Sequence, residues 1–215
     1  MSQKIYKTIF VILIIALIIV IGLIVFKYID GYKNDQKNKE VVETFSRSIS
    51  KINNENNENN INDAISESTE EKEIVTMNGY NVIGIIKIAK IGIEYPILDA
   101  NASNPDDTKE PMKYGIVKYW GGNVNDYGNL SVAGHNYYNG TMFGKTKKLA
   151  IGDIVELTDL NNNTIQYKIY DKLIIDPNDV TILASNDRTI REVTLITCTN
   201  GNENRLVLKA KEVIK

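Results

Sequence analysis

An almost unbroken apolar run over residues 9–26 opens the chain, with Gly22 as its one small interruption. As a helix rising about 1.5 Å per residue, this run is about 27 Å long, close to the thickness of the hydrocarbon layer of a membrane. It ends in Phe26 and Lys27, which do not resemble the small-residue site of a cleaved signal peptide. The pattern predicts an uncleaved transmembrane signal anchor over 9–26 behind a short tail, 1–8. A cleaved signal with an unusual site is the alternative.

Polar residues dominate the next segment, 27–76. Positions 53–62 contain seven asparagines, and an acidic stretch follows at 66–73. Such a composition offers too little apolar surface to offset the entropy of ordering the chain. We therefore expect a linker over 27–76 that is largely disordered. Residues 31–50 are compatible with a helix near the membrane, because four apolar side chains recur there at helical spacing: Val41, Val42, Phe45 and Ile49.

Short β-branched runs separated by turn residues fill the remainder, 77–215, which has the length of one domain. The runs with this pattern are 82–88, 91–97, 130–135, 153–158, 164–175, 191–199 and 205–213. The last four form two pairs that flank Asn-rich turns, which is typical of β-hairpins. Residues 142–149 fit one or two helical turns. Many short strands with few helical periods predict a mostly β domain, folded as a closed or nearly closed barrel.

The last predicted hairpin carries the one cysteine of the chain, Cys198, and an arginine, Arg205, on its two strands. A turn at Gly201 and Asn202 places these two residues directly opposite each other. A turn at Asn200 and Gly201 leaves them one diagonal step apart. Both turns put the two side chains on one face, because side chains alternate with a period of two, and an odd-length loop would separate them. A guanidinium beside a thiol favours the reactive thiolate and can donate to an oxyanion.

The single histidine, His135, ends another strand-like run directly after Gly134. The spacing alone does not bring it to Cys198. Each candidate also has an ordinary structural interpretation, as a buried cysteine, a solvated histidine or a surface arginine. One cysteine and one histidine are too few for a recognisable zinc site, and the sequence has no G-x-S-x-G motif. A net charge of −2 without basic, aromatic-rich clusters argues against nucleic acid as a partner.

The segment Thr194-Leu195-Ile196-Thr197-Cys198 resembles the T-L-x-T-C signature of sortases, the cysteine transpeptidases of Gram-positive cell surfaces. The Gly134–His135 strand end, the order of histidine, cysteine and arginine, and the six residues between Cys198 and Arg205 also match this family. So does the layout of anchor, linker and C-terminal β-domain. The resemblance covers about residues 82–211 and the anchor. It implies a closed eight-stranded sortase-type β-barrel with short helices, preceded by the N-terminal transmembrane helix.

The resemblance also implies roles for individual residues. Cys198 would attack the Thr–Gly bond of an LPxTG-like sorting signal and form a thioacyl enzyme. His135 would protonate the leaving amine and then deprotonate the incoming one. Arg205 would hold the substrate and stabilise the oxyanion. Thr197 and Ala133 would line the substrate groove.

The implied partners are surface proteins with LPxTG-like C-terminal sorting signals, an amine acceptor from a peptidoglycan precursor or a pilin, and the membrane. We expect no metal and no required cofactor, although some class A sortases bind calcium through loop acids. The acids that could do so are Asp106, Asp107, Glu110, Asp176 and Asp179. The short connection over 176–190 favours a class A or class D type of core, while the segment 140–144 resembles class B and leaves that class open.

This chemistry implies a single-pass protein of the cell membrane with its N-terminus inside and its catalytic domain outside. The lysine count argues for the opposite orientation. Lys4 and Lys7 precede the span, whereas Lys27, Lys33, Lys37 and Lys39 follow it. Two other functions stay open. One is a membrane-anchored β-domain without enzymatic activity, and the other is a different cell-wall cysteine hydrolase, although papain-like enzymes place cysteine before histidine.

Overall fold

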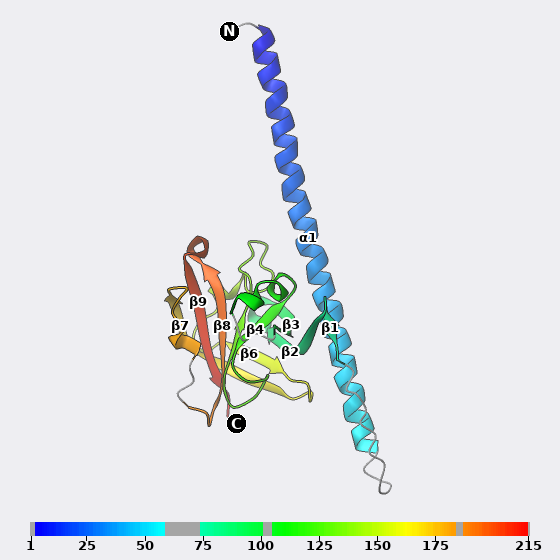
Figure 1. The fold of residues 1–215 in the computed structure, drawn as a ribbon, viewed down its shortest axis with the longest axis vertical. Helices are drawn as coiled ribbons and strands as arrows, with labels where there is room; N and C mark the ends of the chain where they lie inside the picture. Colours follow the sequence, from blue (N-terminus) through cyan, green and yellow to red (C-terminus); the bar gives the residue numbers. More distant parts are fainter. Residues whose placement is uncertain (1–2, 59–73, 101–104, 184–186, 215) are drawn as a thin grey trace. The chain divides into compact units, whose positions relative to one another are not determined.

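The computed structural model describes residues 3–58, 74–100, 105–183 and 187–214. The chain forms two compact units, Met1–Gln36 and Lys37–Lys215. The first unit is a stretch of helix, and the second holds the rest of that helix together with a β-barrel (Figure 1). All the candidate site residues predicted from the sequence belong to the second unit.

The helix α1 spans Gln3–Glu58 and includes the predicted anchor. Its segment Tyr6–Phe26 has 21 residues and a mean hydropathy of 3.7, so it is long and apolar enough to cross a membrane. The predicted anchor over 9–26 lies inside this segment. Its large apolar side chains are exposed, as a helix surrounded by lipid requires.

The segment predicted to be a largely disordered linker, 27–76, is helical as far as Glu58. Here the structure differs from the expectation of disorder. The composition averaged over the whole segment hides the local apolar stripe that stabilises this part of the helix. The Asn-rich and acidic remainder, 59–73, lies outside the described residues. The boundaries between tail, anchor, linker and catalytic domain stay predictions.

The apolar stripe of α1 packs within the second unit. It consists of Val41, Val42, Phe45 and Ile49, all of which are buried. These side chains join an apolar cluster on the outer face of the barrel, which we call the outer cluster. One turn earlier, Asn38 donates its Nδ2 to the carbonyl of Tyr114 at 3.1 Å. This part of the helix is therefore fixed to the barrel by apolar contact and by a directional hydrogen bond.

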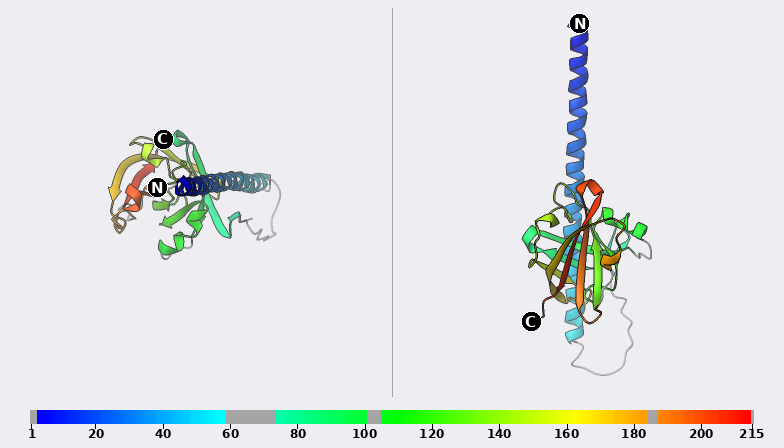
Figure 2. Two further views of the ribbon diagram at one scale, coloured as in Figure 1. Left: turned by 90° about the horizontal axis from the view of Figure 1, so that it is seen from above. Right: turned by 90° about the vertical axis from the view of Figure 1, so that its left-hand side faces the viewer.

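Eight strands of the described chain close into a barrel, as predicted. They are β2 (Tyr80–Ile88), β3 (Ile93–Asp99), β4 (Ile116–Trp120), β5 (Gly128–Ala133), β6 (Ile154–Thr158), β7 (Thr164–Ile175), β8 (Arg191–Thr199) and β9 (Asn204–Glu212). Their order around the barrel is β2-β3-β4-β5-β8-β9-β7-β6, and β6 pairs with β2 to close it. Figure 2 shows the strands from two further directions. A two-residue strand, β1 (Thr76–Met77), pairs antiparallel with the beginning of β2.

Two neighbouring pairs of strands are parallel, β3 with β4 and β5 with β8. The other pairs of the barrel are antiparallel. Strands β6 and β7 separate β5 from β8 in the sequence and return the chain so that β8 lies between β5 and β9. The parallel pairing brings the C-terminal ends of β5 and β8 to the same edge of the barrel.

Alternating side chains build two apolar layers on the strands. The inner layer fills the barrel and includes Val132 of β5 and Leu195 of β8. The outer cluster includes the next residues along, Ala133 and Ile196, together with the stripe of α1. Burial on both faces explains why the runs in β5 and β8 are apolar at consecutive positions. Residues beyond Ala133 and Ile196 then emerge at the rim of the barrel.

Short loops and 3-10 helices join the strands. These helices are η2 (Ala89–Ile91), η3 (Pro105–Thr108), η4 (Pro111–Lys113), η5 (Thr146–Lys148), η6 (Thr181–Leu183) and η7 (Asn200–Asn202). Both predicted hairpins form. In the β6–β7 hairpin, Asp159 Oδ1 accepts the N–H groups of Asn161 and Asn163, at 2.8 and 2.9 Å. One or two helical turns were predicted over 142–149, and the structure has the short 3-10 helix η5 there.

Candidate active site

Cys198 on β8 and Arg205 on β9 are directly paired across the last hairpin. The loop between the two strands contains four residues, 200–203, because Thr199 pairs with Asn204. An even loop keeps the two side chains on one face, so the predicted register is correct although the predicted two-residue turn is too short. The loop turns through residues with positive φ angles: Asn200, Gly201 and Asn202. Asparagine and glycine adopt this left-handed backbone most readily, which explains the residues chosen here.

His135 lies two residues beyond the end of β5, the strand that neighbours β8. Ala133 of β5 pairs in parallel with Ile196 of β8, and each candidate follows two residues later. The Gly134 N–H donates to the Ile196 carbonyl at 3.2 Å and continues the pairing to the strand ends. The imidazole and the thiol line the same cavity, whose volume is about 670 Å³. The structure thus brings together the two residues that the sequence spacing could not connect.

Two hydrogen bonds lock these strand ends together. Thr197 donates its Oγ1 to the Gly134 carbonyl at 2.7 Å. In the opposite direction, Asn136 donates its Nδ2 to the Cys198 carbonyl at 2.8 Å. The histidine and the cysteine therefore each have a neighbour that bonds to the other strand, which restricts their relative movement.

Two residues predicted to line a substrate groove, Thr197 and Ala133, are each only 5% exposed. Thr197 uses its hydroxyl inside the protein, and Ala133 belongs to the outer cluster beside Ile196. Their contact with substrate stays a prediction. Asn136 was missed as a positioning residue. The available signal was its place directly after the histidine at a strand end.

The environment of His135 is partly apolar. The side chain is half-buried, and the ring of Tyr137 lies tilted against it with the two centroids 5.0 Å apart. Burial lowers the pKa of His135 from its ordinary value of 6.5, because water that would solvate the charged ring is displaced. At neutral pH the imidazole is therefore mainly uncharged and able to accept a proton.

Arg205 is half-buried and turned toward its own loop. Its Nη1 donates to the carbonyls of Asn202 and Asn204, at 3.1 and 3.2 Å. It is not among the described residues that line the cavity beside Cys198. Arg205 is therefore paired with Cys198 in the sheet, but it does not line the cavity that Cys198 and His135 share.

The described residues contain no group of three or more His, Cys, Asp or Glu side chains that could hold a metal ion. Two of the acids considered for calcium support local turns instead. Asp176 Oδ1 accepts the N–H of Asn178 at 2.8 Å, and Asp179 Oδ1 accepts that of Thr181 at 3.0 Å. The side chain of Asp106 lies outside the described residues. The calcium question and the expectation of no cofactor stay predictions.

Comparisons of the sequence and of the fold with known proteins all find sortases. A family model described as a sortase domain matches residues 86–213. Sortase A of Staphylococcus aureus (strain NCTC 8325 / PS 47) is 23% identical over 188 residues, covering 86% of this chain and 84% of that protein. A solved Clostridium perfringens structure, described as a Sortase D5 transpeptidase, has a TM-score of 0.60 and 27% identity, with 83% of this chain and 99% of that chain covered. Sortase A from Corynebacterium diphtheriae has a TM-score of 0.56 and 20% identity, with 86% and 92% covered.

Proposed function

The chain belongs to the sortase family, and we propose that it is a membrane-anchored cysteine transpeptidase that cleaves an LPxTG-like sorting signal and transfers the protein to an amine acceptor. The observation that carries this proposal is the parallel register of β5 and β8. It brings His135, two residues after the end of β5, next to the end of β8 that carries Cys198, and both residues line one cavity. A thiol and a mainly neutral imidazole in this position have the chemistry of an acyl transferase.

The first half-reaction forms a thioester. His135 takes the thiol proton as the Sγ of Cys198 attacks the threonine carbonyl of the sorting signal, which becomes a tetrahedral oxyanion. The bond between threonine and glycine breaks as His135 gives the proton to the glycine nitrogen. The C-terminal fragment then leaves, and the surface protein is joined to Cys198.

The second half-reaction runs through the same groups. His135 removes a proton from the incoming amine as its nitrogen attacks the thioester carbonyl. The new amide bond forms, the C–S bond breaks, and the proton returns to the sulfur of Cys198. Arg205 donates to the oxyanion or to a substrate carbonyl in both steps. In the structure without substrate its Nη1 is bonded to two carbonyls of its own loop.

The location and partners belong to the same proposal. The segment Tyr6–Phe26 anchors the protein in the cell membrane, with the N-terminus inside and the catalytic domain outside. The substrates are surface proteins with LPxTG-like signals, and the acceptor is an amine of a peptidoglycan precursor or of a pilin. The chemistry requires no cofactor. Likeness to the Sortase D5 transpeptidase and to Sortase A supports a class A or class D type of core.

The test uses the full chain in detergent micelles with a library of LPxTG-like peptides and several amines. Mass spectrometry should detect a peptide joined to Cys198 and, after an amine is added, the transfer product. Hydroxylamine should release the thioester as a hydroxamate. Cys198→Ala provides the matched control, because the described chain has one free cysteine. Absence of any thioester with every peptide would reject the transpeptidase assignment.

A further inference from the structure

The cavity beside Cys198 has an unbalanced charge. Three lysines line it, Lys145, Lys147 and Lys148, while its described lining contains no aspartate or glutamate. The whole chain carries a net charge of −2. The cavity wall therefore differs in sign from the rest of the molecule, and it does so next to the reactive thiol. Charges of one sign that line a hollow concentrate oppositely charged molecules there.

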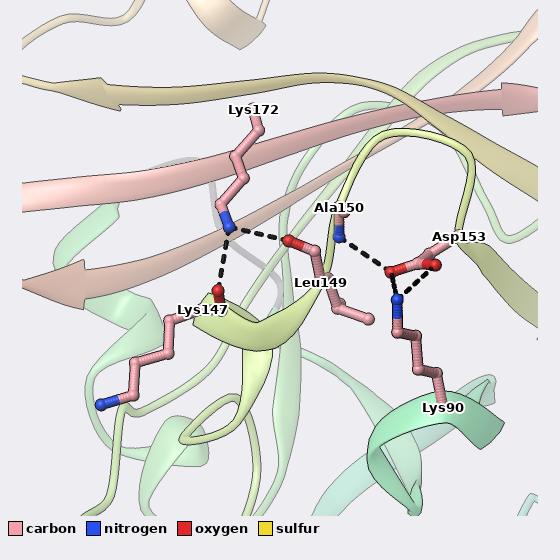
Figure 3. A network of polar contacts seen from close by, with 6 residues as sticks. All are labelled: Lys90, Lys147, Leu149, Ala150, Asp153 and Lys172. Carbon is pink, nitrogen blue, oxygen red and sulfur yellow. Dashed lines mark hydrogen bonds and ion pairs between the residues drawn. The ribbon is translucent and has the colours of Figure 1, made fainter.

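The turn that carries these lysines is firmly held. Lys172 of β7 donates its Nζ to the carbonyls of Lys147 and Leu149, at 2.9 and 2.7 Å. On the other side, the Ala150 N–H donates to Asp153 at 2.8 Å, and Lys90 also binds this carboxylate (Figure 3). Figure 3 shows the Lys147 side chain extending away from this junction. The backbone of this turn is thus fixed, while the ammonium group of Lys147 points away from these hydrogen bonds.

The lysine-bearing turn is also connected to the catalytic histidine. The N–H of Phe143 donates to the carbonyl of His135 at 3.0 Å. Three residues after Phe143, Thr146 donates its Oγ1 to the Phe143 carbonyl at 2.7 Å. Leu149 anchors the end of the turn in the inner layer of the barrel. The lysines are therefore part of the same rigid loop system that positions the imidazole.

The apolar residues of the neighbouring strand ends are buried and separate from the cationic cavity. The outer cluster, which includes Ala133 and Ile196, is apolar, and neither of these residues lines the cationic cavity. A peptide of leucine, proline, threonine and glycine has no fixed anionic group for lysines to bind. The cationic cavity is therefore suited to the second substrate, the acceptor.

We propose that the cavity lined by Lys145, Lys147 and Lys148 is the acceptor site, and that it selects amines whose own molecule carries anionic groups, either carboxylate or phosphate. This inference rests on the proposed transpeptidase function. The lysines attract the anionic part of the acceptor. The same positive field lowers the pKa of the acceptor's ammonium group, which increases the fraction of neutral, nucleophilic amine. An amine without nearby acids is repelled, so the site discriminates against it.

The test compares acceptors that differ only in charge, Gly-Gly-Glu-Glu and Gly-Gly-Gln-Gln, with the full chain in micelles. Two exposed lysine–anion pairs contribute up to about 1 kcal/mol each, which corresponds to a preference for the glutamate acceptor of up to about thirtyfold in kcat/KM at low salt. Raising the salt to a concentration on the order of 0.5 M should reduce this preference several-fold, because the charges are screened. A third acceptor, Gly-Gly-phosphoserine, identifies the favoured anion: a rate above that of the glutamate peptide assigns phosphate, and a lower rate assigns carboxylate.

Matched charge removals complete the test. Lys147→Gln with Lys148→Gln should reduce the preference to about twofold, since both side chains are exposed and their packing is not disturbed. Lys168→Gln with Lys211→Gln removes two exposed lysines that pair across β7 and β9, away from the cavity, and should keep the preference. Hydroxamate release measures the first half-reaction in every sample. Failure of that release in the wild type contradicts the transpeptidase itself. Release with equal rates for both acceptors, or an unchanged preference after Lys147→Gln with Lys148→Gln, overturns the acceptor site alone.

Discussion

The side chain of Asn136 reaches from the loop after β5 to the backbone of Cys198, with its Nδ2 2.8 Å from the Cys198 carbonyl oxygen. This bond joins the residue after His135 to Cys198, the proposed nucleophile. Asn136→Ala should lower kcat for peptide cleavage by about tenfold, the equivalent of about 1.4 kcal/mol of positioning. Because the side chain is exposed, the thermal midpoint should change little. Steady-state kinetics and a melting curve check both statements; normal kcat would make the bond incidental to catalysis.

Thr197 offers a test that separates a structural role from contact with substrate. Thr197→Val keeps the shape but leaves the buried Gly134 carbonyl without its donor, at a cost of about 1–3 kcal/mol in unfolding free energy. Thr197→Ser keeps the donor and loses a methyl group. Chemical denaturation should therefore show a large loss for valine and a small loss for serine. A raised KM for the sorting peptide in the serine variant would instead support the predicted role in the groove.

The geometry around Arg205 predicts an effect on catalysis rather than on folding. Arg205 pairs with Cys198 in the sheet, and its Nη1 contacts the loop. Arg205→Lys retains the charge but loses the planar fork. We expect kcat/KM for peptide cleavage to fall by the equivalent of about 2–4 kcal/mol, the contribution of one oxyanion donor. The thermal midpoint serves as the control. Wild-type kcat/KM in Arg205→Lys would mean that backbone amides hold the oxyanion.

The single histidine makes its own titration measurable. A proton NMR titration of the imidazole should give a pKa below 6.5, because burial disfavours the charged ring. The unfolded chain then binds more protons than the folded protein in the window between the lowered pKa and the ordinary one. Stability must therefore rise with pH through this window and decrease as the pH falls through it. His135→Gln should lack this pH dependence, and a measured pKa at or above the ordinary value would contradict the prediction.

Phe45 should contribute to stability although it lies in a segment whose composition predicted disorder. The side chain is 1% exposed, and Phe45→Ala should cost as much as about 3 kcal/mol unless the helix detaches first. The neighbouring Thr44→Ala, at an exposed position of the same helix, is the matched control. A protein that begins at Met77 should melt at a lower temperature than one that begins at Lys37, while its active site remains. Equal melting temperatures would show that the stripe contributes nothing.

The sequence predicted those parts of the site that depend on local geometry. That Cys198 and Arg205 share one face of the hairpin followed from the alternation of side chains, which any even loop preserves. The meeting of His135 with Cys198 did not follow, because it depends on parallel pairing between strands that are separated by a long stretch of chain. No local pattern specifies which distant strands become neighbours. The barrel itself was predictable in class and strand number, since the resemblance supplied what periodicity could not.

In the predicted linker, the expectation of disorder was wrong as far as Glu58, where the chain is helical. Averaging the composition over 27–76 gave too little apolar surface for order, yet four residues on one helical face suffice to dock a short segment. The spacing of Val41, Val42, Phe45 and Ile49 was visible in the sequence. What the sequence did not contain was the receiving surface, which exists only after distant strands assemble into the outer face of the barrel.

The position of β8 between β5 and β9 has a consequence for the timing of assembly. Cys198 belongs to a strand that can enter its place only after β6 and β7 have led the chain around the barrel, and Arg205 belongs to the final strand. Contacts of such high sequence separation form slowly, so folding is governed by chain closure rather than by local turns. Refolded protein should thus regain transpeptidase activity only in the last kinetic phase. Because Cys198 and Arg205 belong to the last two strands, the proposed site is complete only after the C-terminal hairpin has joined the barrel.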